Sequence, residues 1–308
     1  MGVALLCVSY YRRIPLPEGR GNSIRIYLTS VMPNKKIVII LSFLILLFST
    51  LFAAYYYLTH YPRLNTYHVT IDAKKLTDIQ GGLSGLTWNP DTQTLFSVTD
   101  DPSSIIEISP EGTVLRTIKT DRSADLEAIE YMGDNHYFLS KEKLGELALV
   151  TINSQTKMLN ISQAETYKPD IAAGKKNSGL EGLAWKADLE KMVTAQEKKP
   201  VRLYNILQND ETFRTHKSSL NDLMLSWYVK DISGMDFDSS TNNLYILSHE
   251  SKTVIQVDGE HNLKFMPLTA GNSGLKDNIP QPEGIASDDA GNLYIVSEPN
   301  LFYKFSLR

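Results

Sequence analysis

The chain has 308 residues, enough for one large all-β domain or for two ordinary domains. Residues 1–36 hold six Lys or Arg against one Glu, an excess of +5, so the whole-chain charge of −4 leaves −9 on the remainder. An acidic body without a basic stripe argues against nucleic-acid binding and makes cations the more natural partners. The single cysteine, Cys7, precedes the apolar segment, so the main domain has no disulfide and no thiolate metal site.

The N-terminal segment, residues 1–36, shows no amphipathic period and is predicted to be a cytoplasmic tail without a fold. The sequence from Met32 to Lys36 has the form of an ordinary signal-anchor start. Translation beginning at Met32 is therefore the alternative to a tail.

Residues 37–58 carry no charged side chain and are predicted to form a transmembrane anchor. At 1.5 Å per residue this stretch spans roughly 33 Å, which matches a bilayer core. Lys35 and Lys36 precede it, so the positive-inside rule puts the N-terminus in the cytoplasm and the body outside. Cleavage after Ala54 is the alternative, and Phe52 at the −3 position argues against it.

One short segment recurs five times in residues 62–308, and this repeat is the main evidence for the fold. The copies are Ser84-Gly-Leu-Thr-Trp88, Glu127-Ala-Ile-Glu-Tyr131, Glu181-Gly-Leu-Ala-Trp185, Ser233-Gly-Met-Asp-Phe237 and Glu283-Gly-Ile-Ala-Ser287. After each copy comes a turn rich in Asn, Asp or Gly and then a second apolar strand, such as Leu293-Tyr-Ile-Val-Ser297. Units of this length with three or four strands are typical of propeller blades.

The body is therefore predicted to be an all-β, five-bladed propeller over residues 62–308. The chain ends after the third strand of the fifth unit, and a strand at 66–71 is expected to supply the missing outer strand and close the ring. The small residue after each motif position is expected to lie innermost, where the blades converge. Residues 200–229 are the least regular part, and a sixth blade hidden there is the alternative.

The chain resembles the SdiA-regulated family of membrane-anchored bacterial β-propeller proteins. The resemblance rests on the Glu-Gly-Leu/Ile repeats at 181–183 and 283–285, on the Leu-Tyr-Ile-Val/Leu-Ser strands and on the membrane-proximal layout. It implies a five-bladed propeller with a calcium site, distantly similar to NHL-repeat propellers and metal-dependent lactonases. With the anchor, it implies a location in the bacterial inner membrane with the propeller in the periplasm. It implies no specific activity, and Ser84 and Ser233 depart from the Glu found in other units.

Two columns of polar residues are expected to face one mouth of the central tunnel. The first column is the motif position, and the second lies 15 or 16 residues later, where the next strand ends. Antiparallel pairing puts the end of that strand beside the start of the first. The columns are Ser84, Glu127, Glu181, Ser233 and Glu283, and then Asp100, Glu142, Glu197, His249 and Glu298.

Crowded carboxylates repel one another, and a divalent cation removes that penalty. Ca²⁺ accepts six to eight oxygens in irregular geometry, so it fits this donor set better than Zn²⁺ or Mg²⁺. The predicted metal ligands are Glu127, Glu181, Glu283, Glu142, Glu197 and Glu298, and the predicted ligand-facing residues are Asp100, His249, Ser84 and Ser233. The alternative is that these acids pair with nearby lysines or are solvated at the rim.

Four aromatic residues stand four positions into the motif, namely Trp88, Tyr131, Trp185 and Phe237. Side-chain alternation predicts that they share a blade face with the motif residue and pack in the core, with ligand stacking as the alternative.

No sequence pattern nominates a catalytic residue, since nucleophile-elbow, zinc-protease and phosphate-loop motifs are absent. The leading hypothesis is a calcium-binding propeller that presents its tunnel mouth to a small-molecule or protein ligand outside the cytoplasm. The first alternative is a metal-dependent hydrolase of the lactonase or esterase type, in which an acid or His249 moves a proton. The second is a scaffold with an inert tunnel.

Overall fold

The computed structural model describes residues 34–60, 62–121, 125–171, 180–196, 201–209, 212–220 and 225–308. It contains two compact units, Met1–His60 and Tyr61–Arg308. The expected tail and the alternative start at Met32 lie outside the described residues.

The described part of the first unit is one helix, α1 (Lys35–His60). The Asn34 side chain accepts a hydrogen bond from the Lys36 amide at 3.0 Å and so caps the start of this helix. Its stretch Lys35–Tyr56 has a mean hydropathy of 2.8 and is long and apolar enough to cross a membrane. The expectation of one N-terminal apolar helix is confirmed.

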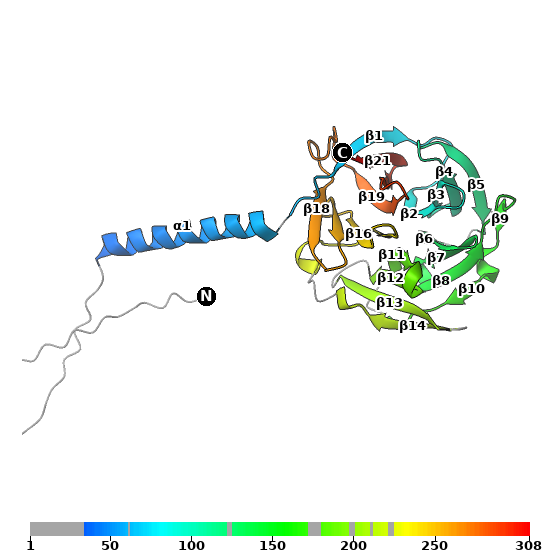
Figure 1. Ribbon diagram of the computed structural model, residues 1–308, viewed down its shortest axis with the longest axis horizontal. Coiled ribbons are helices and arrows are strands. Elements are labelled where there is room, and N and C mark those ends of the chain that lie inside the picture. Colours follow the sequence, from blue (N-terminus) through cyan, green and yellow to red (C-terminus); the bar gives the residue numbers. More distant parts are fainter. Residues whose placement is uncertain are drawn as a thin grey trace, which may run out of the picture. The chain divides into compact units, whose positions relative to one another are not determined.

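The second unit consists of five sheets arranged around a central axis, and their strands pair antiparallel except for β5 (Val114–Thr120) and β9 (Met158–Leu159), which pair in parallel (Figure 1). Each sheet is one blade, and the strand that carries the repeated motif lies innermost. Blade 1 is β2 (Leu83–Asn89), β3 (Thr94–Thr99), β4 (Ser104–Ile108), β5 (Val114–Thr120) and β9 (Met158–Leu159). Blade 2 is β6 (Leu126–Gly133), β7 (His136–Lys141), β8 (Glu146–Thr151) and β10 (Glu165–Tyr167). Blade 3 is β11 (Leu180–Lys186), β12 (Lys191–Gln196), β13 (Arg202–Asn209) and β14 (Thr212–Lys217).

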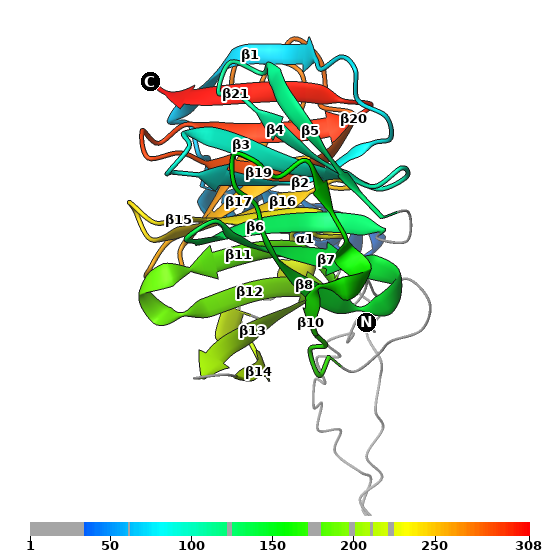
Figure 2. The same ribbon diagram turned by 90° about the vertical axis from the view of Figure 1, so that its right-hand side faces the viewer.

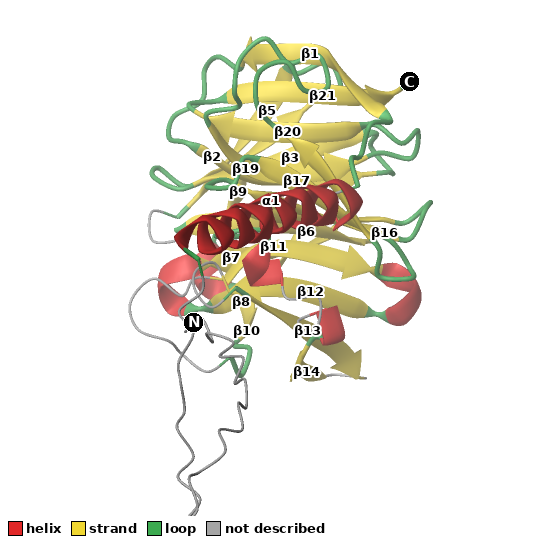
Figure 3. Ribbon diagram, turned by 90° about the vertical axis from the view of Figure 1, so that its left-hand side faces the viewer, coloured by secondary structure: helices red, strands yellow, loops and turns green. Residues whose placement is uncertain are grey.

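The remaining two blades complete the ring. Blade 4 is β15 (Gly234–Asp238), β16 (Asn243–Ser248), β17 (Thr253–Val257) and β18 (Leu263–Pro267). Blade 5 is β19 (Gln281–Ser287), β20 (Leu293–Glu298), β21 (Leu301–Leu307) and β1 (Tyr67–Lys75). Short 3-10 turns also occur at Glu142–Leu144, Ile161–Gln163, Ala187–Leu189 and Leu225–Trp227. The side view in Figure 3, with strands in yellow, shows how fully β structure dominates this unit.

The ring closes through the N-terminal strand, as the sequence predicts. β1 pairs antiparallel with the C-terminal strand β21, with Tyr67 opposite Leu307 and Val69 opposite Phe305. Figures 1 and 2 show β1 as the outermost strand of the blade that contains β21. The outer edge of β21 is therefore paired rather than open.

The five-bladed expectation is confirmed, and the six-bladed alternative is wrong. The irregular stretch 200–229 supplies β13 and β14, which are the third and fourth strands of blade 3. It looked irregular in the sequence because the next blade begins only at β15, after the turn at Leu225–Trp227.

The repeated motif lies on the innermost strands, where the blades converge and leave the least room for side chains. Each innermost strand contacts those of the two neighbouring blades, and β19 contacts β2 to complete the circle. A Cβ built on Gly85 lies 2.8 Å from the Cα of Ala128, and one on Gly284 lies 2.5 Å from the carbonyl carbon of Gly85. Because real Cβ atoms do not approach that closely, the small residue is a requirement of blade convergence.

Five hydrophobic clusters fill the spaces between neighbouring blades. The cluster between blades 4 and 5, for example, joins Tyr245, Leu247 and Met266 to Ile285 and Phe305. Comparable clusters lie between each other pair of adjacent blades. Packing of blade against blade thus holds the innermost strands, and the residues at their two ends, in fixed positions.

Candidate functional site

The tunnel has two mouths, which the direction of the innermost strands distinguishes. We call the mouth where these strands begin the first mouth and the one where they end the second mouth. Antiparallel pairing places the ends of the second strands at the first mouth, as in Leu83 opposite Thr99 and Gln281 opposite Glu298. The described residues that the sequence predicts for the site belong to the first mouth.

The motif residues of the first mouth differ in burial. Glu127, Glu181 and Glu283 are half-buried, whereas Ser84 and Ser233 are buried. The Ser233 hydroxyl donates to the Pro282 carbonyl at 2.7 Å, which ties blade 4 to blade 5. Ser233 therefore has a structural partner at the place where the sequence suggested a ligand contact.

One pair at the first mouth has the geometry of a functional contact. His249 Nδ1 lies 3.1 Å from Glu283 Oε1, and both side chains are partly exposed. Burial and the nearby Lys252 ammonium lower the pKa of His249 from its usual value, and the carboxylates of Asp231, Glu250 and Glu298 only partly oppose this. The lowered pKa favours an uncharged imidazole at neutral pH, and the Nδ1–H tautomer of that imidazole can donate to Glu283.

Asp100 and Glu298 both lie against the backbone at Gly82. The Gly82 amide donates to Asp100 Oδ1 at 3.2 Å. A Cβ on Gly82 would stand 2.3 Å from Glu298 Oε1, so that carboxylate covers the glycine backbone. These two acids position the chain that leads into β2.

The expected calcium ligands do not form a group of metal-binding size in the described residues. Among those residues, no three His, Cys, Asp or Glu side chains lie close enough together to hold one ion. The Glu142 side chain and the whole of Glu197 lie outside the described residues. The calcium site at the first mouth therefore stays a prediction.

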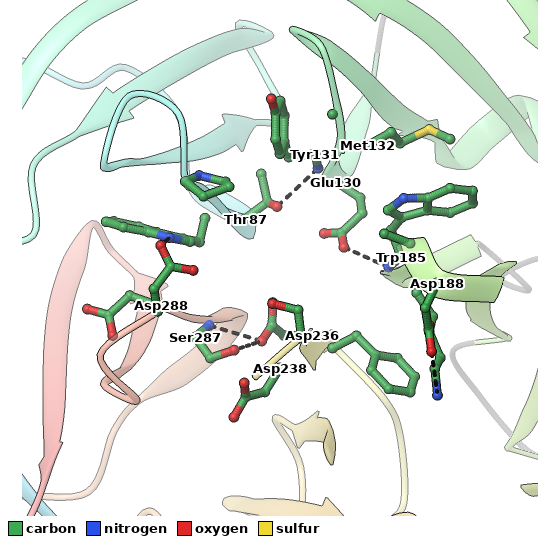
Figure 4. Close-up of a pocket in the computed structure, with 18 of the residues that line it drawn as sticks. Thr87, Glu130, Tyr131, Met132, Trp185, Asp188, Asp236, Asp238, Ser287 and Asp288 are labelled. Carbon is green, nitrogen blue, oxygen red and sulfur yellow. Dashed lines mark hydrogen bonds and ion pairs between the residues drawn. The ribbon is translucent and has the colours of Figure 1, made fainter. Parts of the chain in front are cut away.

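The second mouth contains a pocket of about 750 Å³ that the sequence analysis did not anticipate. It is lined by the last residues of β2, β6, β11 and β15, by Ser287 at the end of β19, and by the turns that follow them. Figure 4 shows Thr87, Glu130 and Asp236 pointing into the same space, from blades 1, 2 and 4. The pocket is thus built by the convergence of separate repeats on the axis.

These three residues occupy the same place in their repeats, three positions beyond the motif residue, and make the same kind of contact. The Tyr131 amide donates to Thr87 Oγ1 at 3.1 Å, and the Trp185 amide donates to Glu130 Oε1 at 2.7 Å. The Ser287 amide likewise donates to Asp236 Oδ2 at 2.9 Å, and the Ser287 hydroxyl donates to the same oxygen. Each contact links one blade to the next.

Glu130 and Asp236 can accept more hydrogen bonds than the inter-blade link uses. Glu130 and Asp236 are 4% and 5% exposed, and Glu130 Oε2 has no hydrogen-bond donor in the described structure. Both oxygens of an ionised carboxylate accept hydrogen bonds, and burying one of them without a donor costs free energy. Thr87 makes the same inter-blade link without a charge. The link alone therefore does not account for carboxylates at the other two positions.

Burial raises the pKa of both acids. For Glu130 burial is the larger cause and the Asp236 charge the next, while the Trp185 amide and the Thr87 hydroxyl act in the opposite direction. Burial raises the pKa of Asp236 to about 7, with Asp238 adding to the effect and Ser287 opposing it. Raised pKa values favour protonation of the pair when no cation is present, and a positive charge between the two acids would favour their ionised form.

The four aromatic residues of the repeat line this pocket as well as packing on the blade cores. Trp88 stacks on Tyr294 with the rings 7° from parallel, and its Nε1 donates to Asp289 at 3.4 Å. The predicted shared face with the motif residue is wrong in β2 and β11. A one-residue bulge at Gly85 and at Gly182 shifts the register there and reverses the alternation of side chains.

Charge around the pocket is strongly negative. Eight of the described lining residues are acidic, namely Asp91, Glu130, Asp134, Asp188, Asp236, Asp238, Asp288 and Asp289, and Lys186 is the basic one among them. The Lys186 ammonium lies 5.1 Å from the centre of the Phe237 ring and 3.8 Å from Asp188 Oδ2, so it is engaged at the rim. The buried pair thus has no cationic partner among the described lining residues.

Comparison with known families identifies the chain. The model of the family described as SdiA-regulated matches residues 60–306. This chain belongs to the SdiA-regulated family. The match covers the whole ring of blades, in agreement with the resemblance that the Glu-Gly repeats indicated.

Several solved structures are similar to this SdiA-regulated protein, although their sequence identity to it is low. A luciferin-regenerating enzyme is 15% identical, with 78% of this chain and 94% of that chain covered and a TM-score of 0.48. A gluconolactonase from Xanthomonas campestris is 11% identical, with 78% and 97% covered and a TM-score of 0.49. Virginiamycin B lyase from Staphylococcus aureus is 11% identical, with 78% and 74% covered and a TM-score of 0.41. Similarity at this level carries no conclusion about activity.

Sequence reasoning missed Glu130 and Asp236, although one signal was available. Three positions beyond the motif residue, the five repeats read Thr87, Glu130, Ala184, Asp236 and Ala286. An acidic residue within an otherwise apolar innermost strand is unusual, and it occurs in two of the five repeats. The more numerous acids of the first mouth are the stronger signal in the sequence.

Proposed function

We propose that this protein is a membrane-anchored binding module outside the cytoplasm, whose second-mouth pocket accepts a positively charged group between Glu130 and Asp236. The observation that carries the proposal is the buried carboxylate pair, which includes an oxygen without a donor. The excess of acids around the pocket supports it, because an acidic rim attracts cations over a distance of roughly 8 Å at physiological salt.

Anchoring through α1, with the propeller in the periplasm of a bacterial inner membrane, is part of the same proposal. Its support is the uncharged stretch after Lys35 and Lys36. Alkaline phosphatase fused after Arg308 is expected to be active and β-galactosidase fused there inactive, since the phosphatase requires the oxidising side of the membrane. The reverse pattern would overturn the topology.

Calcium is the inorganic cation expected from the sequence, and it remains a proposal. The described first-mouth residues supply pairs such as His249 and Glu283 rather than a cage of acids. A calcium site at that mouth would therefore draw on backbone carbonyls and water together with Glu127, Glu181 and Glu283. Calorimetric titration of Ca²⁺ into the full chain in detergent tests this idea, with Glu181→Gln as the first-mouth variant.

The cation-binding proposal itself is tested by thermal melting of the full chain with a panel of inorganic and organic cations at constant ionic strength. At least one cation is expected to raise the melting temperature of the natural protein more than that of the double variant Glu130→Gln, Asp236→Asn. Asp78→Asn is the matched control, because it removes one carboxylate from an exposed position outside the pocket lining, with positive φ that Asn also tolerates. Equal shifts in the natural protein and the double variant would refute the proposal.

A hydrolase is the second candidate, and the His249–Glu283 pair favours it. An uncharged imidazole held at 3.1 Å by a carboxylate is the arrangement of a general base and the group that orients it. Turnover of lactones or aryl esters that is lost in His249→Asn would support this candidate. No turnover by the natural protein across such a panel, with and without Ca²⁺, would remove it.

A further inference from the structure

The ligand of the second-mouth pocket can be specified further from the groups that line it. Three observations bear on its chemistry: the oxygen that lacks a donor, the size of the donor set, and the walls around it. The inference rests on the proposed function, since it concerns the same pocket.

When Glu130 is ionised, its unpartnered oxygen requires a hydrogen-bond donor. Glu130 lines the pocket, and its buried Oε2 has no donor in hydrogen-bonding geometry in the described structure, although the nearby Thr87 hydroxyl favours the ionised form. A quaternary ammonium ion carries charge but no N–H, so it would leave this oxygen unsatisfied. A protonated primary amine brings three N–H donors in one positive group.

The described pocket residues offer few oxygen ligands for a metal ion. Ca²⁺ requires six to eight oxygens, whereas the described residues bring no three acidic or His side chains together at one point. An ammonium group needs about three acceptors. Glu130 and Asp236 supply two carboxylates, and Thr87 has its hydroxyl oxygen at the same place.

The volume and the walls indicate an organic ligand. A pocket of 750 Å³ is many times larger than the roughly 30 Å³ that one water molecule or small ion occupies. Trp88, Tyr131, Trp185 and Phe237 line it, and aromatic faces attract cations. Lys186 already shows such a contact on Phe237. Its ammonium also bonds to Asn242 and lies near Asp188, so it is not the partner of the buried pair.

We propose that this pocket binds a small organic amine through a protonated primary amino group, which donates hydrogen bonds to Glu130 and Asp236 while its carbon chain lies against the aromatic walls. The inter-blade links explain why the charged pair can serve this purpose. Each acid keeps one oxygen on a backbone amide, and this bond holds the carboxylate in place at the pocket wall.

The test uses calorimetric titration of the full chain in detergent at about 0.15 M salt, where nonspecific attraction to the acidic rim is screened. The probes are spermidine, N-acetyl-lysine amide, tetramethylammonium and Ca²⁺. Spermidine or the lysine derivative is expected to bind about tenfold or more tightly than tetramethylammonium, and their ratio tells whether the natural source is a free polyamine or a lysine side chain.

The variants decide whether the buried pair is the site. Glu130→Gln and Asp236→Asn each keep an oxygen for the inter-blade link and remove the charge, so each is expected to weaken amine binding by about tenfold or more. Asp78→Asn, which alters an exposed acid outside the pocket lining, is expected to change it by less than about threefold. Should Glu130→Gln fail to fold, Glu130→Thr copies the uncharged link that Thr87 makes.

The outcomes separate this inference from the function on which it rests. Amine binding that is unchanged in both pair variants, or tetramethylammonium binding as tight as spermidine, overturns the inference. If Ca²⁺ binds and requires Glu130 and Asp236 while amines do not bind, the amine is overturned and the cation-binding function stands. If no probe depends on the pair, both are overturned.

Discussion

Removal of the Asp236 charge should stabilise the ligand-free propeller at alkaline pH. Asp236 has a folded pKa of about 7 against an ordinary value of 3.8, and the main cause is burial. The folded protein therefore holds a proton that the unfolded chain releases between these two values, so stability falls as pH rises through this window. At 1.36 kcal/mol per pKa unit the full effect is about 4 kcal/mol, present above pH 7 and absent below pH 4.

Asn at this position keeps an oxygen for the Ser287 amide and resembles the protonated acid, and the pKa of about 7 already includes the Ser287 hydrogen bonds to the ionised form. Asp236→Asn is therefore expected to match the natural protein at pH 4 and to be more stable by up to about 4 kcal/mol at pH 8. Denaturant unfolding of both proteins at several pH values measures the difference, with Asp134→Asn as the control for loss of a rim charge.

The reasoning is wrong if the stability difference between Asp236→Asn and the natural protein does not change with pH. It is also wrong if Asp134→Asn shows the same pH-dependent difference, because an exposed acid has no burial penalty to lose. Both measurements must be made without added amines or divalent ions, since a bound cation would stabilise the ionised pair and hide the effect.

Further predictions address the ring and the first mouth. Gly85→Ala should destabilise the propeller by about 2–4 kcal/mol in denaturant unfolding, because its Cβ would meet Ala128, whereas Gly145→Ala, with similar positive φ and open space, should cost about 1 kcal/mol. Truncation that removes β1 should leave β21 unpaired and abolish soluble folding, whereas a chain that begins at residue 62 should retain its circular-dichroism spectrum. An NMR titration should find a His249 midpoint below 6.5, and the neutral-imidazole assignment fails if the midpoint is higher.

The fold could be predicted from the sequence because one physical constraint recurs at one position. Blade convergence leaves no space for a Cβ at Gly85 or Gly284, so the small residue marks every innermost strand and gives the number of blades. The closing strand followed from the same count, since the fifth unit lacks an outer strand and the N-terminal strand is free to supply it.

The pocket could not be predicted in the same way, for two reasons. A one-residue bulge is invisible in a repeat of constant length, yet it reverses which face Trp88 and Trp185 occupy relative to the motif residue. Burial of an acid is also a property of the assembled ring. Glu130 and Asp236 are separated by more than a hundred residues and become a pair only because blades 2 and 4 meet at the axis.

The inter-blade link at the second mouth connects the stability of the ring with the chemistry of its pocket. Thr87 shows that a hydroxyl is sufficient for the link, and Ala184 and Ala286 show that a blade can do without it. Carboxylates at the two remaining positions repel each other and cost stability when ionised. A costly charge at a place where an uncharged residue performs the structural task is best explained by a ligand that neutralises it. Ligand binding and ring stability are therefore coupled, and the cation that fills the pocket should also protect the propeller against unfolding.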